Sequence, residues 1–163
     1  MNKPVTITEL RRSCSKYDEI SRKRYSAYNL LHGYCDITSY AIATQLLDEG
    51  HTVRLYRITQ NEGDGERDVV VNFIHQYCLV DGHYFVDIRG AYTDWEKFIA
   101  EFKRHAKRKH DMEITDANTK IIDVTSSAGE MLWILNGYPE DCDEGQTISE
   151  ILTEYLSEHP IAI

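Results

Sequence analysis

The sequence lacks long apolar runs and closely spaced pairs of cysteines. No stretch approaches the ~20 apolar residues that a membrane-spanning helix needs. Polar and charged residues follow Met1 where a signal peptide would carry an apolar core, so we expect a cytoplasmic protein. The cysteines at positions 14, 35, 78 and 142 form no Cys-x-x-Cys pair, which excludes a zinc ribbon and a thioredoxin-type site. Their even number permits two disulfides, but an intracellular chain favours reduced thiols.

Basic residues are missing from the C-terminal quarter of the chain. Residues 121–163 contain nine acidic residues and no lysine or arginine, whereas residues 1–120 contain 18 basic and 18 acidic residues. The whole net charge of −9 therefore lies after residue 120. An acidic surface repels a nucleic-acid backbone, so nucleic-acid binding is not expected. The acidic region suits either solubility or a basic protein partner, and both interpretations stay open.

Length and composition predict one domain over residues 1–163. The chain is 42% hydrophobic and 28% charged, as is usual for a folded domain, and it contains no repeat or low-complexity linker. A first helix is expected through residue 30 with Thr8 as its cap, and a second runs from Cys35 to a stop at Gly50. Apolar patterns and turn signals predict strands at 52–59, 69–80, 83–89 and 121–124. Further helices are predicted after a capping box at 93–96, over 126–136 and over 147–158.

Cys35 is a candidate nucleophile because it opens the clearest helix of the chain. A cysteine attacks well only as its thiolate, and free thiols have a pKa of ~8.5. The unpaired amides and the dipole of a helix N-terminus lower that pKa. Gly33 lets a substrate come close, since it has no side chain. A small buried cysteine at a helix start is the alternative interpretation.

The turn after residue 80 decides whether His75 and Asp87 meet. A two-residue type I′ turn would place them on opposite faces of the sheet. A three-residue turn with Gly82 left-handed would place His75 directly opposite Asp87. At that separation a carboxylate orients an imidazole, so the sequence permits a base and its orienting acid.

A series of short motifs stands in order between residues 29 and 90. It consists of Gly33-x-Cys35 at a helix start, Leu46-Leu47 before Gly50, Arg54 on the next strand, His75 on a long strand, and Tyr84-Phe85 before Asp87. This series resembles the core of the transglutaminase-like, papain-related superfamily. The resemblance implies an α+β fold, papain-like or transglutaminase-like, with a nucleophile helix packed on an antiparallel sheet and additional helices over 93–163. It also implies Cys35 as nucleophile, His75 as general base and acid, and Asp87 as the residue that orients His75.

An acyl-transfer site of this kind needs an oxyanion hole. The backbone N–H of Cys35 is one expected donor. Papain-like enzymes supply a second donor from a glutamine just upstream of the cysteine, and Asn29 is similarly placed here. His32 and Tyr34 are competing candidates for that role.

Two alternatives concern the residues of the triad themselves. His83 lies on the same predicted face as His75 and could replace it as the base. Cys35, His75 and Asp87 could bind zinc by ligand type, but only three ligands are visible, so no metal or cofactor is expected.

The expected chemistry is acyl transfer at an amide or ester carbonyl through a thioester. Water as acceptor makes the protein a hydrolase such as a peptidase, isopeptidase or deamidase, and an amine acceptor makes it a transglutaminase or other acyltransferase. The competing hypothesis is a catalytically inactive binding module that keeps the fold and engages a protein partner through its acidic C-terminal region or its basic segment at 103–109. A protein or peptide is the expected partner in both cases, and a membrane is not.

Overall fold

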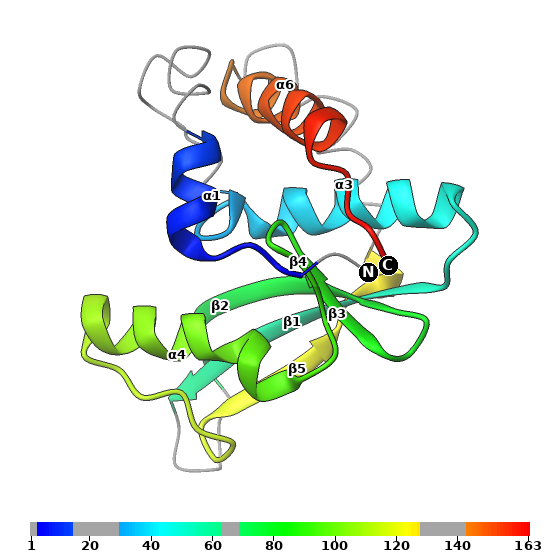
Figure 1. Ribbon diagram of the computed structural model, residues 1–163. Helices are drawn as coiled ribbons and strands as arrows, with labels where there is room; N and C mark the ends of the chain where they lie inside the picture. The colour runs from blue at the N-terminus through cyan, green and yellow to red at the C-terminus, as the bar shows by residue number, and fades with distance from the viewer. Residues whose placement is uncertain (1–2, 15–29, 63–68, 128–142) are drawn as a thin grey trace.

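Helices and antiparallel strands make up the part of the chain that the computed structural model describes, residues 3–14, 30–62, 69–127 and 143–163 (Figure 1). The helices are α1 (Ile7–Cys14), α3 (Cys35–Asp48), α4 (Trp95–His110) and α6 (Asp143–Glu158), with a 3₁₀ turn at Thr125–Ser127. The strands are β1 (Val53–Glu62), β2 (Val69–Val80), β3 (Tyr84–Asp87), β4 (Gly90–Tyr92) and β5 (Thr119–Asp123). The predicted α+β class is confirmed.

The strands form one antiparallel sheet in the order β4-β3-β2-β1-β5. The central strand, β2, has the bounds that its apolar pattern predicted, and it pairs with β1 along its length. Its pairing with β3 covers only Cys78–Val80. On that side, β2 has no strand partner before Cys78 among the described residues.

The two faces of the sheet are covered by different helices. Successive side chains of β2 alternate between the faces, so His75 and Tyr77 share one face and Gln76 shares the other with Cys78. Aromatic side chains of α4 cover the first face, where the ring centroids of Tyr77 and Phe98 lie 5.0 Å apart. α3 covers the second face and places eight buried residues along its length. In Figure 1, α1, α3 and α6 lie together on one side of the sheet and α4 lies on the other.

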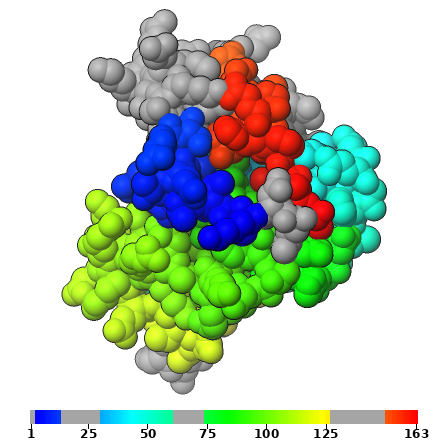
Figure 2. Space-filling view, in the orientation of Figure 1, coloured from blue at the N-terminus to red at the C-terminus, as the bar shows by residue number. Residues whose placement is uncertain are grey.

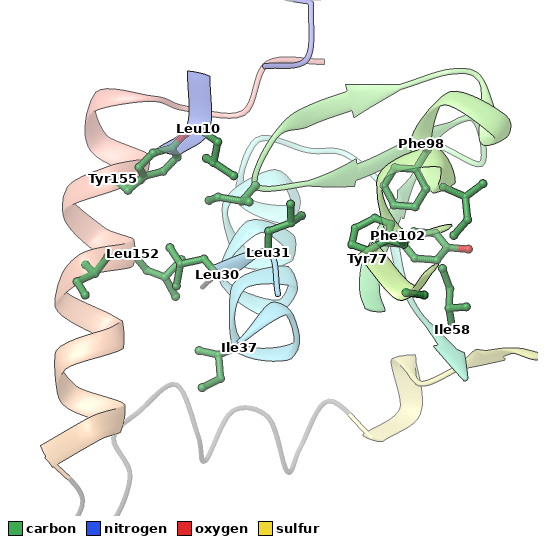
Figure 3. Packing of buried hydrophobic residues seen from close by; sticks show 14 of the residues in the cluster. Leu10, Leu30, Leu31, Ile37, Ile58, Tyr77, Phe98, Phe102, Leu152 and Tyr155 are labelled. Carbon is green, nitrogen blue, oxygen red and sulfur yellow. The ribbon is translucent and has the colours of Figure 1, made fainter. Parts of the chain in front are cut away.

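Two clusters of buried apolar residues stabilise these layers. Figure 3 shows the first, which extends from α1, α3 and α6 to the space between the sheet and α4; its labelled members are Leu10, Leu30, Leu31, Ile37, Ile58, Tyr77, Phe98, Phe102, Leu152 and Tyr155. The second cluster packs α3 against the sheet and includes Ile42, Leu46, Leu55, Cys78 and Val86. The surface view places α1 directly beside α6 (Figure 2). No helix within the described residues is both long enough and apolar enough to cross a membrane.

The helix caps differ from the predicted ones by one or two residues. α1 begins with a capping box at Thr6, whose Oγ1 accepts the Glu9 N–H at 3.2 Å while Glu9 Oε2 accepts the Thr6 N–H at 2.6 Å. The predicted cap, Thr8, is wrong because it lies inside the helix. α4 is capped by Asp94 rather than by the preceding threonine, since Asp94 Oδ1 accepts two N–H groups of the first turn.

Several predicted boundaries changed in the structure. The short strand β4 was not predicted, and α6 begins at residue 143 rather than 147. The predicted continuation of the first helix beyond Cys14 lies outside the described residues, as does most of the predicted helix at 126–136.

Candidate active site

Cys35 is the first residue of α3, as its sequence context predicted. The preceding residue, Tyr34, occupies the cap position without a side-chain hydrogen bond to the helix. Within the first turn, Asp36 Oδ1 accepts the Ile37 N–H at 2.8 Å, so one of the amides at this helix start is already bound by a side chain. The helix ends just before Gly50, which has a φ of 92° where a left-handed residue is needed. The predicted extent of the helix that begins at Cys35, to about Leu47–Glu49, is confirmed.

The Cys35 thiol is buried, and this overturns one electrostatic expectation. The side chain is free of disulfides and Cys35 is only 2% exposed. Burial raises the pKa of the thiol to about 12, and the neighbouring Asp36 acts in the same direction. Backbone amides of Gln76, Gly33 and Cys35 itself favour the thiolate, but they do not compensate. The expectation that the helix N-terminus leaves Cys35 with a lowered pKa is therefore wrong.

A cavity of about 500 Å³ lies beside Cys35, between the start of α3, the middle of β2 and the C-terminal half of α4. Its walls combine apolar side chains with three imidazoles. The lining residues are His32, Gly33, Cys35, Ile74, Phe102, His105, Ala106, His110, Asp111 and Met112. A buried thiol next to a cavity of this size leaves room for a small group beside the sulfur.

The turn between β2 and β3 combines features of both predicted alternatives. Asp81 and Gly82 both have positive φ, 51° and 65°, yet strand pairing starts at Val80 and Tyr84, which leaves three residues in the loop. This register lies two residues away from the one that would set His75 directly opposite Asp87. A shift of two keeps both side chains on the same face and makes their contact diagonal.

His75 and Asp87 form a hydrogen-bonded pair on the α4 side of the sheet. His75 Nε2 lies 3.1 Å from Asp87 Oδ2, and both side chains are almost completely buried. Because a carboxylate only accepts hydrogen bonds, Nε2 carries the proton and Nδ1 is the acceptor nitrogen in the neutral ring. Nδ1 has no partner within ordinary hydrogen-bond geometry among the described residues, although the Leu31 backbone acts on the ring and favours its protonated form.

Arg89 binds the other side of the same carboxylate. Its Nε and Nη2 donate to Asp87 at 3.0 and 2.7 Å, and its backbone N–H donates to Asp87 Oδ1 at 2.9 Å. Nη2 also donates to the Phe98 carbonyl at 3.1 Å. The guanidinium is packed among the rings of Tyr92, Phe98 and Phe102, with centroid distances of 4.7, 5.2 and 4.9 Å.

Burial and charge act in opposite directions on this pair. Burial alone would raise the pKa of Asp87, but Arg89 and His75 hold that pKa well below its ordinary value. Burial lowers the pKa of His75, and the opposing effect of Asp87 does not cancel it. At neutral pH Asp87 is therefore a carboxylate and His75 a neutral imidazole.

The structure forms the pair of His75 and Asp87 but not a bond from His75 to Cys35. The His75 ring stacks on Phe102, with 3.9 Å between ring centroids. Cys35 instead lies near the next residue of β2, Gln76, whose backbone amide favours the thiolate form of Cys35. The predicted triad residues thus come from neighbouring elements, and the free nitrogen of His75 is the group that would have to receive the thiol proton.

Polar contacts on the opposite face of β2 hold α3 against the sheet. The side chain of Gln76 donates to Ser39 Oγ at 2.9 Å, and Cys78 Sγ donates to the Ser39 carbonyl at 3.0 Å. Arg57 donates to Gln76 Oε1 at 2.9 Å from β1. These contacts fix the helix that carries Cys35.

The remaining candidates are placed as follows. Asn29, the predicted oxyanion donor, lies outside the described residues. His32 lines the cavity and stacks on His105 at 4.1 Å between ring centroids, and burial lowers its pKa to about 3. His83 lies in the exposed turn before β3, so the alternative that it replaces His75 on that face is wrong. Within the described residues, no group of three or more His, Cys, Asp or Glu side chains is arranged to hold a metal ion.

Sequence reasoning missed Arg89, Gln76 and His105. Arg89 follows Asp87 by two residues, and the alternation of a strand could have placed them on one face. Gln76 follows His75 directly, so alternation also predicted that it would face away from it. His105 offered no such signal, because its place in the cavity depends on how α4 packs against the sheet.

Three comparisons with known proteins gave no match to this chain: no family model, no curated protein and no solved structure is similar to it at a significant level.

Proposed function

We propose that this protein is a cysteine-nucleophile acyl-transfer enzyme of papain-like or transglutaminase-like architecture, acting on an amide or ester carbonyl. The observation that carries the proposal is the state of His75. Asp87 binds its Nε2 at 3.1 Å in a buried site, and its Nδ1 is left without a hydrogen-bond partner among the described residues. A neutral imidazole held in this way supports a role as general base for a proton that comes within reach of Nδ1.

The reaction proceeds in two acyl transfers. His75 Nδ1 takes the proton of Cys35 as the sulfur attacks the carbonyl carbon, and the backbone N–H of Cys35 stabilises the oxyanion. The oxyanion collapses, the bond to the leaving nitrogen or oxygen breaks, and His75 returns the proton to the leaving group. Water or an amine then attacks the thioester and gives its proton to His75. The thiol is restored when that proton returns to sulfur.

The raised pKa of Cys35 supports a specific version of this mechanism. With a pKa of about 12, very little thiolate exists before substrate arrives. Proton transfer to His75 then accompanies the attack instead of preceding it, as it does for a serine nucleophile.

A small activated ester tests the proposal. With p-nitrophenyl acetate we expect a burst of p-nitrophenolate and an acetyl group on Cys35, found by peptide mass spectrometry. Cys35→Ala should lose the burst and His75→Ala should slow it, whereas Cys78→Ala serves as the matched control and should keep it. Acetylation that is equal at Cys78 and Cys35, or unaffected by His75→Ala, would rule out this mechanism.

The burial of Cys35 favours a second candidate, the catalytically inactive binding module. A thiol that is 2% exposed, beside a cavity that Phe102 helps to line, is also what a packing residue would show. Site-resolved alkylation by iodoacetamide separates the two candidates. The enzyme predicts faster modification of Cys35 than of Cys78 in the folded protein, and the module predicts that both stay inert until unfolding.

A further inference from the structure

Asp87 is a shared carboxylate. His75 uses one bond to Oδ2, whereas Arg89 uses its backbone N–H, Nε and Nη2 on the two oxygens. A guanidinium in this bidentate position neutralises a carboxylate more completely than an imidazole can. All three side chains are at most 5% exposed, so solvent does not screen them.

We propose that Arg89 is a positioning residue: it keeps Asp87 ionised and turned toward Nε2, and it keeps His75 neutral with Nδ1 as the proton acceptor. This inference rests on the proposed function only in its consequence for catalysis. The resting site then contains a neutral thiol and a neutral imidazole, not a thiolate–imidazolium ion pair.

The surroundings of His75 support this assignment. An unshared carboxylate would draw a proton onto the imidazole, but Arg89 opposes that effect and acts to lower the pKa of His75. On the loop before α3, the Leu31 backbone acts to raise the pKa of His75, but burial outweighs it, and the pKa of the nearby His32 is itself lowered by burial. α4 presents only the rings of Phe98 and Phe102 to His75, and its Glu101 and His105 lie against His32 instead.

Nuclear magnetic resonance of the ¹⁵N-labelled imidazole measures this state without any substrate. In the unmodified protein we expect the His75 ring to be the neutral Nε2–H tautomer from pH ~7 down to pH ~5.5, below the ordinary histidine pKa of ~6.5. A protonated ring in that range, or the Nδ1–H tautomer, overturns the proposal.

Variants test the role of the guanidinium itself. Arg89→Met should raise the pKa of His75 by about one unit or more, because Asp87 then acts on the imidazole alone. Arg89→Lys keeps the charge and should restore a value near that of the unmodified protein. Arg57→Met is the matched control, because Arg57 binds Gln76 on the opposite face of β2 and should leave His75 unchanged. An unchanged His75 pKa in folded Arg89→Met overturns the proposal.

The variant Arg89→Met could fail to fold, and the experiment remains decisive in that case. The tautomer of His75 in the unmodified protein and in Arg89→Lys already distinguishes the alternatives. The ester burst is a separate measurement, so a protein with the expected His75 state and no burst would refute the proposed function and keep the role of Arg89.

Discussion

Two adjacent residues of β2 carry different polar networks on the two faces of the sheet. His75 faces α4 and meets a buried ion pair, Asp87 and Arg89. Gln76 faces α3 and meets uncharged groups of that helix, above all the hydroxyl of Ser39. The charged network sets where a proton can reside, whereas the amide and hydroxyl contacts set where the Cys35 helix lies. One strand thus holds the candidate base and the candidate nucleophile helix in a fixed relation.

Removing Arg89 should have the largest effect on stability. Arg89→Ala leaves Asp87 as a buried carboxylate with too few partners, so we expect a loss of about 3–5 kcal/mol in the free energy of unfolding. Urea unfolding followed by circular dichroism measures this loss. Arg57→Ala, on the other face, should cost clearly less. Similar losses for both arginines would contradict the distinction between the two networks.

The buried groups on the α4 side of the sheet should also make the free energy of unfolding depend on pH, with stability lost in acid. His75 and His32 have folded-state pKa values below the ordinary ~6.5, so below that pH the unfolded chain binds protons that the folded protein does not. Stability is therefore lost as pH falls, by about 1.4 kcal/mol per pH unit for each such histidine. Asp87, whose folded-state pKa is lowered, adds a further loss below pH ~4.

Urea unfolding at several pH values between ~7 and ~5 checks this slope. His32→Gln should reduce it, because one of the two buried neutral rings is gone. His83→Gln is the control, since that side chain lies in an exposed turn. A stability that is flat over this range would mean that the buried histidines already carry protons in the folded protein.

Removing the contacts of Gln76 with α3 should make Cys35 more accessible without changing the state of His75. Gln76→Ala removes the bond to Ser39 and the acceptor for Arg57, and we expect a cost of about 1–2 kcal/mol. Iodoacetamide should then modify Cys35 faster, while the ¹⁵N signals of His75 keep their positions. A shift of the His75 signals instead would show that the two networks are coupled.

The same strand shows how much of the site the sequence could reveal. The apolar run gave β2 its bounds, and the glycine signals placed Cys35 at a helix start, because both depend on local chemistry. The pairing of His75 with Asp87 was predicted on the correct face, but its register was two residues off. The register depends on the turn, where Asp81 adopts a positive φ beside Gly82. This backbone conformation depends on the folded turn and not on a local sequence signal.

The protonation state of the site could not be read from the sequence. A helix start predicted an acidic thiol at Cys35, but the burial that raises its pKa arises from packing between α3, β2 and α4. The stacking of His75 on Phe102 likewise requires the register of α4 on the sheet, to which no local motif refers.

The smallest effect on stability is expected for Cys35→Ala, and Cys78→Ala is the variant with which it is compared. Cys35→Ala removes a thiol next to a cavity, so little packing is lost and the free energy of unfolding should fall by ~1 kcal/mol or less. Cys78→Ala should cost more, because its sulfur is fully buried and donates to the Ser39 carbonyl. Urea unfolding of both variants gives the two values. A folded Cys35→Ala protein makes the loss of the ester burst a statement about chemistry. A loss of stability as large as that of Cys78→Ala would instead make Cys35 a core residue, and the binding module would become the better account.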